Sequence, residues 1–578
     1  MKSIAKLTVG ALFAGAMSTA SAFIPTGDEN ADIVIRHSGA TASSQSLIRS
    51  VIQVCDPAGN NDAFVSELEG GGDVTDFFDT TNRHGGDYFV IACEVAAGGT
   101  AAVPLALQGS GSAPGGLFTM IYYKRDPGGS AMGVQPLANN SDVGYMSVVT
   151  DCGTPAGTDD WHDCANSPTT SYVGPSHVGT SDVEPVIFTA LENNTGAGID
   201  WNNDGLSNNV IPTDAQIANL TTQVTAYLTF GVPANYRLYT ALQYAQFATG
   251  HPNFDDCNPG GANYGSLAVD ADNAASEECM PNLSTQQINS LFVRNRTVNL
   301  LTELFAPTTF GGATLQSVWD FIPATGAPYA QDTYTGSLSP LQQPQEAVIV
   351  CRRTEGSGTG AQHMLFYHNY PCDRDSADLN IDVNLPATES PSPVIFNGIR
   401  EGTGSSRVSD CLLAFDDGSN PGSNNPNPAG YQMAAIGLQS ATRSEDDDHN
   451  WRYIKIDGHS PSLSNVHAGK YEQVFAQTWQ TASITNGNEL LVVNALITAS
   501  STPSFADSLN NDQTFGRLGW LANAGSGNCG AACTSDETLN PSLPVYPFVR
   551  ESNIGSPNSC SIPRAASFPA GAGIGVGD

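Results

Sequence analysis

The feature that most restricts the fold is a buried-type strand that leads through a glycine-rich turn into a helix. The strand is expected at 347–350, the turn at Gly356-Ser357-Gly358, and helical spacing of apolar residues at 359–369. The same order occurs near the N-terminus, where Ile33-Val34-Ile35 precedes a helical pattern that starts at Thr41. This alternation predicts an α/β architecture with largely parallel sheets.

Similar patterns predict further elements along the chain. Strands are expected at 118–123, 394–396, 433–438 and 453–456, and helices at 284–293 and 463–468. Stretches rich in Gly, Asn, Asp and Pro separate them, and because most contain cysteines we interpret them as disulfide-stapled surface insertions. One short echo, between 353–359 and 400–406, we attribute to turn composition.

The first 22 residues have the pattern of a signal peptide. Lys2 and Lys6 precede an apolar stretch at 7–17, and Ala20-Ser21-Ala22 forms a small-residue cleavage site. The pattern predicts an exported protein, periplasmic or secreted. No later apolar run reaches the ~18 residues that a membrane span needs, so no membrane insertion is expected.

The chain has 12 cysteines, all after the predicted cleavage site. An even number in an oxidising compartment favours structural disulfides over metal sites. Pairing of neighbours along the chain predicts Cys55–Cys93, Cys152–Cys164, Cys257–Cys279 and Cys351–Cys372. The remaining cysteines have three possible pairings, which stay open: Cys411, Cys529, Cys533 and Cys560.

The charge balance excludes one class of partner. The chain has 22 Lys and Arg against 57 Asp and Glu, a formal net charge of −35. Nucleic-acid binding draws its affinity from basic patches that release counterions, so DNA and RNA are not expected as partners.

The turn at 356–358 has the chemistry of an anion site. The first N–H groups of a helix lack intrahelical partners, and the helix dipole favours negative charge there. Arg353 lies four residues before Ser357, within reach of an anion held at that terminus. The alternative is an ordinary capped turn with a surface arginine.

The segment from Arg353 to Thr359 resembles the Arg-x-Asp/Glu-Gly-Ser-Gly-Thr signature of the phosphate-specific periplasmic binding proteins, the solute receptors of ABC uptake systems. Three further segments are similar to that family's ligand loops, in the same order. They are Ser38-Gly39-Ala40-Thr41, Gly128-Gly129-Ser130-Ala131-Met132-Gly133 and Gly179-Thr180-Ser181-Asp182. The resemblance implies an α/β, two-lobed, type II periplasmic-binding-protein-like fold, here with disulfide-stapled loop insertions.

Carried over residue by residue, the resemblance implies an oxyanion enclosed between two lobes. Arg353 would supply positive charge, and Ser357, Gly358 and Thr359 would donate hydrogen bonds. Donors from the opposite lobe would come from Ser130 and from Ala40 and Thr41. Asp182 would select an anion that still carries a proton, because a carboxylate only accepts hydrogen bonds. Asp182 and Ser130 are also explained as turn or helix caps.

The resemblance also implies discontinuous lobes. One would combine 23–195 with 466–578, including a Cys-containing C-terminal extension, and the other would span 196–465. The segment 42–180 and the tail after 500 have no counterpart that assigns them a role.

One segment suggests a metal. Asp200, Asn202 and Asp204, followed by Gly205, have the spacing of a calcium loop. Ile211 occupies the last ligand position, where a bidentate Glu belongs, so an Asn/Asp-rich turn is the alternative. No other cofactor is expected.

The sequence therefore predicts an exported receptor that captures phosphate or a related oxyanion, with an ABC permease as the partner that the resemblance implies. No motif of a serine hydrolase or a zinc protease occurs, and we expect no enzymatic activity. Two alternatives remain: a cell-surface, matrix or adhesion protein that reuses the fold, and an extracellular phosphoester hydrolase.

Overall fold

The structure of the 578-residue chain is a computed structural model. The described residues are 25–56, 61–66, 88–99, 103, 105–152, 161–164, 169–189, 200–201, 210–247, 257, 274–293, 299–300, 347–369, 371–372, 399–402, 404–418, 433–443, 451–482, 487–510, 518–523, 543–553, 556–561 and 563–565. The predicted signal peptide and the strand expected at 394–396 lie outside them, as do Cys529 and Cys533.

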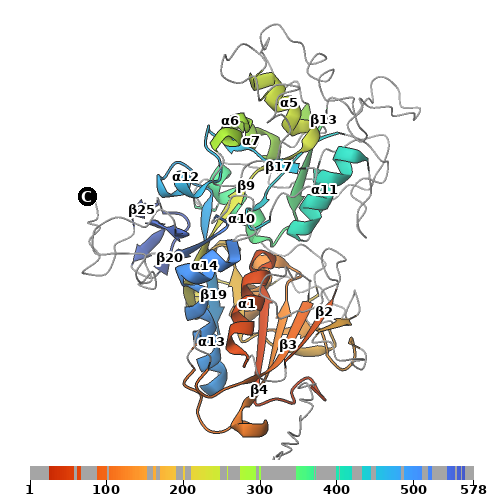
Figure 1. The fold of residues 1–578 in the computed structure, drawn as a ribbon, viewed down its shortest axis with the longest axis vertical. Helices are drawn as coiled ribbons and strands as arrows, with labels where there is room; N and C mark the ends of the chain where they lie inside the picture. The colour runs from red at the N-terminus through yellow and green to blue at the C-terminus, as the bar shows by residue number, and fades with distance from the viewer. Residues whose placement is uncertain are drawn as a thin grey trace, which may run out of the picture.

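The chain forms two lobes, each built on its own sheet, which lie one above the other in Figure 1. Lobe 1, the lower one, contains an 11-stranded sheet. Its strands, in spatial order, are β21 (Val545–Tyr546), β20 (Trp520–Asn523), β9 (Thr221–Gly231), β19 (Val474–Thr481), β8 (Val178–Ser181), β1 (Ile33–Gly39), β4 (Phe118–Arg125), β3 (Tyr88–Val95), β2 (Asp62–Ser66) and β6 (Trp161–Cys164), with β16 (Gln439–Ser440) paired to β9.

Lobe 2 contains a six-stranded sheet. Its strands are β12 (Asn299–Leu300), β13 (Ala347–Arg353), β15 (Ala434–Gly437), β10 (Pro233–Asn235) and β17 (Trp451–Tyr453), with β14 (Ile399–Gly402) paired to β13. Four two-stranded ribbons pair β5 (Asp142–Tyr145) with β7 (Tyr172–Pro175), β11 (Asn282–Leu283) with β18 (Lys455–Ile456), β22 (Phe548–Val549) with β25 (Arg564–Ala565), and β23 (Glu551–Asn553) with β24 (Ser556–Pro557).

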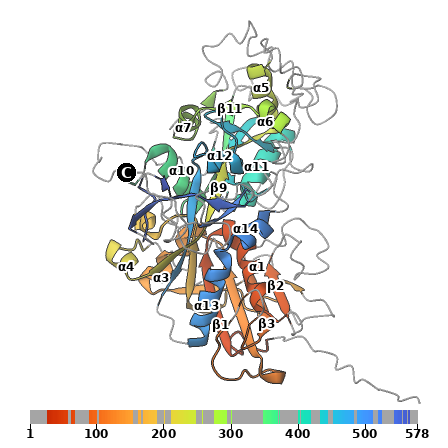
Figure 2. The same cartoon turned by 60° about the vertical axis from the view of Figure 1, so that its left-hand side comes forward.

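Helices pack on both sheets. They are α1 (Ser44–Val54), α2 (Gly129–Met132), α3 (Gln135–Asn139), α4 (Asp214–Ala218), α5 (Tyr236–Phe247), α6 (Ala274–Cys279), α7 (Thr285–Val293), α10 (Gly358–His368), α11 (Ser405–Asp417), α12 (Leu463–His467), α13 (Gly487–Ser500) and α14 (Pro503–Asn510). Figure 2 shows α1 and α13 side by side on lobe 1, where Leu47 and Leu496 join Ile35 of β1 in one buried apolar cluster.

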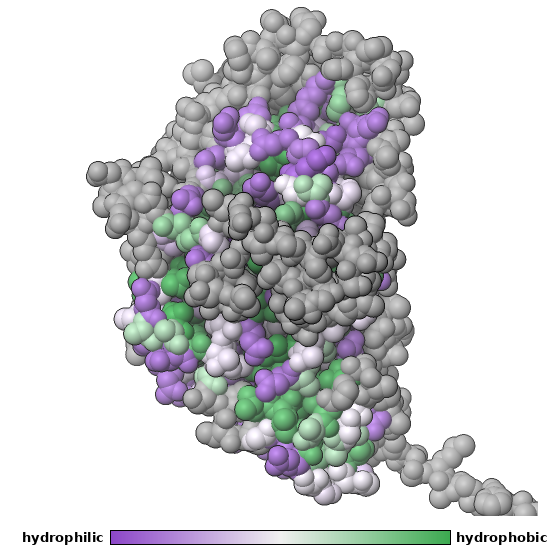
Figure 3. Space-filling view, turned by 90° about the vertical axis from the view of Figure 1, so that its left-hand side faces the viewer, coloured by the Kyte–Doolittle hydropathy of each residue, from purple (hydrophilic) through white to green (hydrophobic). Residues whose placement is uncertain are grey.

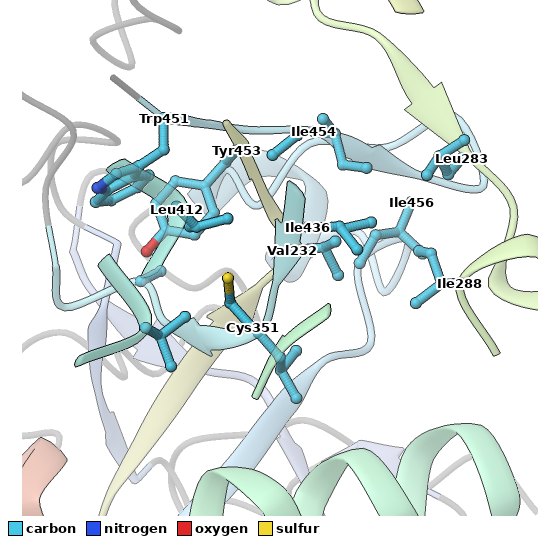
Figure 4. Close-up of a cluster of buried hydrophobic side chains, with 14 of the residues drawn as sticks. Val232, Leu283, Ile288, Cys351, Leu412, Ile436, Trp451, Tyr453, Ile454 and Ile456 are labelled. Carbon is cyan, nitrogen blue, oxygen red and sulfur yellow. The ribbon is translucent and has the colours of Figure 1, made fainter. Parts of the chain in front are cut away.

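Lobe 2 has a second large core. Cys351 of β13, Leu412 of α11 and Ile436 of β15 meet Trp451 and Tyr453 of β17 there (Figure 4). The same cluster also contains Tyr227 of β9 and Val474 of β19, so it continues into the sheet of lobe 1 at the waist. Figure 3 shows hydrophilic side chains spread over the upper lobe on one face of the molecule.

The sheets are mixed, and the expectation of largely parallel sheets is wrong. β1 runs parallel to β4 and β8, and β13 runs parallel to β14 and β15. However, β19 is antiparallel to both β8 and β9, and β3 is antiparallel to β2 and β4. The strands that end in the predicted ligand loops, β1, β4, β8 and β13, all have a parallel neighbour.

The second lobe begins later than the predicted boundary at 196. β9 belongs to the sheet of lobe 1, where it pairs with β19 and β20, and the chain enters lobe 2 only at β10. β16 then returns to pair with β9. The waist is therefore built from β9, β16 and β19, and Figure 1 labels β9 between the lobes.

The structure contains three of the four predicted local disulfides, Cys55–Cys93, Cys152–Cys164 and Cys257–Cys279. The predicted Cys351–Cys372 pair is wrong: Cys351 bonds to Cys411, and Cys372 bonds to Cys560. The reason is α10, an 11-residue helix of about 16 Å that separates Cys372 from the strand carrying Cys351. No helix in the described part of the chain combines the length and apolar character needed to cross a membrane.

Candidate functional site

Three loops of lobe 1 meet at one edge of its sheet. Ala40 follows β1, Ser130 follows β4 and Asp182 follows β8, and the parallel pairing of β1 with both neighbours places these strand ends together. The side chains of Ser130 and Asp182 are in contact: the Ser130 hydroxyl donates to Asp182 Oδ2 at 3.3 Å and accepts from the Asp182 N–H at 3.1 Å. Ser130 lies inside α2, whose N-cap is Gly128, so its hydroxyl serves Asp182 and does not cap the helix.

The opposite half of the site is the N-terminus of α10 in lobe 2. Gly356 has φ 80°, a conformation that glycine adopts readily, and it turns the chain from β13 into the helix. Ser357 caps the helix, because its hydroxyl accepts from the Gly360 N–H at 3.3 Å. The predicted strand, turn and helix of this segment are all present, and Figure 1 places α10 at the waist between the lobes.

The two halves touch directly. The Ala131 N–H donates to the Gly356 carbonyl at 2.9 Å, and the Gln362 side chain donates to the Asp182 carbonyl at 3.0 Å. A Cβ atom at Gly358 would lie 2.2 Å from the Ser130 hydroxyl oxygen and 2.8 Å from Asp182 Cβ. Only glycine therefore fits where α10 faces lobe 1.

Apolar contacts accompany this polar junction. Ala361 and Leu365 of α10 belong to the same buried cluster as Ala131, Val134 and Val183 of lobe 1. The structure thus shows the lobes closed on each other, with the N-terminal part of α10 shared between them.

Asp182 is the acidic group of the site. Its side chain is 2% exposed, and Oδ1 has no hydrogen-bond partner among the described residues. Burial raises the pKa of Asp182 to about 6, although the positive charge of Arg353 and the hydrogen bond from Ser130 oppose that rise. The group is therefore ionised at pH 8 and presents a free acceptor oxygen in a dry location.

Arg353 is the basic group of the site, and lobe 2 holds it in place. Its guanidinium donates to the Gly402 carbonyl at 3.3 Å and to the Ser405 hydroxyl at 3.2 Å. Ser405 opens α11, which follows the neighbouring strand β14. Thr359 is the second residue of α10, and its buried hydroxyl has no hydrogen-bond partner among the described residues.

Three residues of this arrangement were not predicted: Lys124, Gln362 and Ser405. Lys124 is the next-to-last residue of β4, is fully buried in an ion pair with Asp126, and donates to the Gly39 carbonyl at 2.5 Å. A charged pair that ends an apolar strand, Lys124 with Arg125, was the available signal. For Ser405 the signal was the echo between 353–359 and 400–406.

Two sequence-based candidates stand differently in the structure. The Ala40 N–H already donates to the Thr180 carbonyl at 3.0 Å, so this amide is not available to an anion. Within the described part of the chain, Thr41 is not among the hydrogen-bond partners of Ser130 or Asp182. Of the calcium candidates, the Asp200 carbonyl accepts from Arg125 at 3.1 Å, while Asn202 and Asp204 lie outside the described residues. Among the residues described, no cluster of His, Cys, Asp and Glu could hold a metal ion.

No protein-family model matches the sequence, and no curated protein matches it either. Solved structures with a similar arrangement include a protein described as a phosphate ABC transporter substrate-binding protein from Clostridium perfringens with bound phosphate. It shares 11% identity over 82% of this chain and 97% of its own, with a TM-score of 0.33.

Two further solved structures are similar at the same level. PstS from Borrelia burgdorferi shares 9% identity over 84% of this chain and 99% of its own, with a TM-score of 0.26. An ABC-type phosphate transport receptor from Vibrio cholerae shares 10% over 56% of this chain and 73% of its own, with a TM-score of 0.23. Scores this low do not assign the chain to that family.

Proposed function

We propose that this protein binds a protonated tetrahedral oxyanion, phosphate first of all, between its two lobes. The observation that carries the proposal is the buried junction of opposite charges at the N-terminus of α10. There Asp182 Oδ1 and the Thr359 hydroxyl are buried and have no hydrogen-bond partner within the described part of the chain, and Arg353 acts electrostatically on Asp182. Helix N–H groups and an arginine favour an anion, and a carboxylate that only accepts favours an anion that carries a proton.

Phosphate fits this combination of groups. Near neutral pH it carries at least one proton, which can bridge to Asp182, while its other oxygens accept from Arg353 and from α10. Sulfate has no such proton and would place a second negative charge against Asp182. If the wrong ligand leaves a buried polar group of the site unpaired, the site discriminates strongly against that ligand.

The physiological role that we propose is capture by an exported receptor, with delivery to an ABC permease as its consequence. The signal-peptide pattern at 1–22 supports export. Binding alone accounts for the groups at the site, and we propose no catalytic step.

Calorimetric titration of the wild-type protein and of Arg353→Ala with phosphate tests the proposal. Wild type should bind, and the variant should lose at least a hundredfold in affinity, because hydrogen bonds to a charged group contribute about 1.5–3 kcal/mol each. Arg352→Ala is the matched control: Arg352 neighbours Arg353 on β13 but pairs with Glu401. Equal affinity of wild type and Arg353→Ala would remove Arg353 from the site.

A further inference from the structure

Two consecutive residues of the C-terminal extension attach to different lobes. The Ser559 N–H donates to Glu184 Oε2 of lobe 1 at 2.7 Å. The next residue, Cys560, forms a disulfide with Cys372, which follows α10 of lobe 2. We call Ser559 and Cys560, with their partners Glu184 and Cys372, the clasp.

The clasp attaches to the segments that carry the two halves of the candidate site. Glu184 lies two residues beyond Asp182, in the loop that follows β8. Cys372 lies four residues beyond the last residue of α10, the helix whose first turn contains Ser357 and Thr359. Each attachment is therefore coupled to its half of the site through a short loop or a single helix.

The extension itself is part of lobe 1. β21 continues the large sheet by pairing with β20, and Arg550 stacks over Phe475 of β19 with 5.5 Å between the guanidinium carbon and the ring centre. The Asn558 N–H, directly before the clasp, donates to the Arg550 carbonyl at 2.7 Å. The disulfide thus ties an element fixed to lobe 1 to a helix of lobe 2.

The other described disulfides stay within one lobe. Cys55–Cys93 and Cys152–Cys164 join elements of lobe 1, and Cys351–Cys411 joins β13 to α11 in lobe 2. Cys257–Cys279 ends at the last residue of α6, whose carbonyl accepts from Gln243 of α5 in lobe 2. Among the bridges that the structure describes, Cys372–Cys560 is therefore the one that joins the C-terminal extension on lobe 1 to lobe 2, and its two cysteines are 188 positions apart. A cross-link that spans two bodies restricts their separation as well as the unfolded chain.

An anion in this site can leave only if the lobes separate. The site residues are closed off from solvent, with Ser130 0%, Thr359 1% and Asp182 2% exposed. Separation would break the Ala131–Gly356 hydrogen bond and would pull α10 away from lobe 1, against the clasp.

We propose that the clasp holds the two lobes closed on the bound anion, so that the residence time of the anion depends on Ser559, Cys560 and their partners. The residence-time part of this proposal rests on the proposed function. The closure part does not, because lobe separation can be measured without a ligand.

The test compares the double variant Cys372→Ala/Cys560→Ala with the control Cys152→Ala/Cys164→Ala, which removes a disulfide from lobe 1 alone. Two quantities are measured: the phosphate dissociation rate, and amide hydrogen exchange of peptides covering 129–134 and 356–362 without ligand. We expect the clasp variant to release phosphate at least tenfold faster and to exchange these amides faster, while the control matches wild type.

Unchanged hydrogen exchange in the folded clasp variant would overturn the proposal. If no protein binds phosphate, the proposed function fails, while faster exchange in the clasp variant alone would still support the clasp. If the double variant does not fold, the variant Glu184→Ala is measured in its place, because it removes the acceptor of the Ser559 N–H and keeps the disulfide. Its exchange should rise at the same peptides, and wild-type exchange there would overturn the proposal.

Discussion

The two halves of the candidate site differ in charge and in construction. Lobe 2 contributes a helix N-terminus and Arg353, both of which attract an anion. Lobe 1 contributes Asp182, which repels one, while its buried Lys124 is neutralised by Asp126. The comparison assigns affinity to lobe 2 and selectivity to lobe 1, because only a ligand with a proton satisfies both.

After Arg353→Ala, the next largest effect on this comparison is expected at Gly358, where the halves meet. In Gly358→Ala the new methyl group would overlap the Ser130 hydroxyl and Asp182, so the lobes cannot close as they do here. Overpacking of this kind costs about 1–3 kcal/mol, and we expect phosphate affinity to fall at least tenfold by calorimetry.

The matched control is Gly360→Ala, in the same helix turn. A Cβ there would lie 3.7 Å from Ser357 Cβ, an ordinary contact, and alanine favours a helix over glycine. This variant should bind phosphate as wild type does. Equal affinities for the two alanine variants would contradict the closed contact between Gly358 and lobe 1.

A smaller effect is expected on the way the free energy of unfolding depends on pH. Burial raises the pKa of Glu184 to about 7, despite the hydrogen bond from the Ser559 N–H, and burial raises the pKa of Asp416 in lobe 2 to about 7. A carboxyl whose pKa is higher in the folded chain binds more protons there. Its contribution to stability is full below about pH 4 and is lost as pH rises towards 7.

The variant Glu184→Gln should therefore make the free energy of unfolding less dependent on pH. We expect the variant to match wild type at pH 4 and to exceed its free energy of unfolding at pH 8 by about 2 kcal/mol. Denaturant titrations at both pH values measure this, with the exposed Glu472→Gln as the control. A variant that loses stability equally at both pH values would show that the hydrogen bond, and not the buried charge, dominates at Glu184.

Local signals predicted the secondary structure of the lobe 2 half of the candidate site. An apolar run, a glycine turn and a capping serine lie within a dozen residues, and the strand and helix expected at 347–350 and 359–369 correspond to β13 and α10. These features depend on neighbours in the chain, so spacing alone reveals them. Lys124 was missed because its burial requires Asp126 and the loop after β1, which the pattern of the strand does not show.

Tertiary contacts explain the other differences between the sequence-based predictions and the structure. The echo at 400–406 was attributed to turn composition, but β14 pairs in parallel with β13, and this register brings Gly402 and Ser405 to Arg353. The pairing of Cys351 with Cys411 likewise follows from the packing of α11 on β13. Neither contact can be derived from the distance between two residues along the chain.

The assignment of affinity to lobe 2 and of selectivity to lobe 1 is tested most directly by the variant Asp182→Asn, titrated with phosphate and with sulfate at pH 8. An amide can donate as well as accept and carries no charge. Wild type should bind phosphate and not sulfate, whereas the variant should gain sulfate binding and lose most of the discrimination. Wild-type protein that binds sulfate as tightly as phosphate, or a variant that still excludes sulfate, would contradict the role assigned to Asp182.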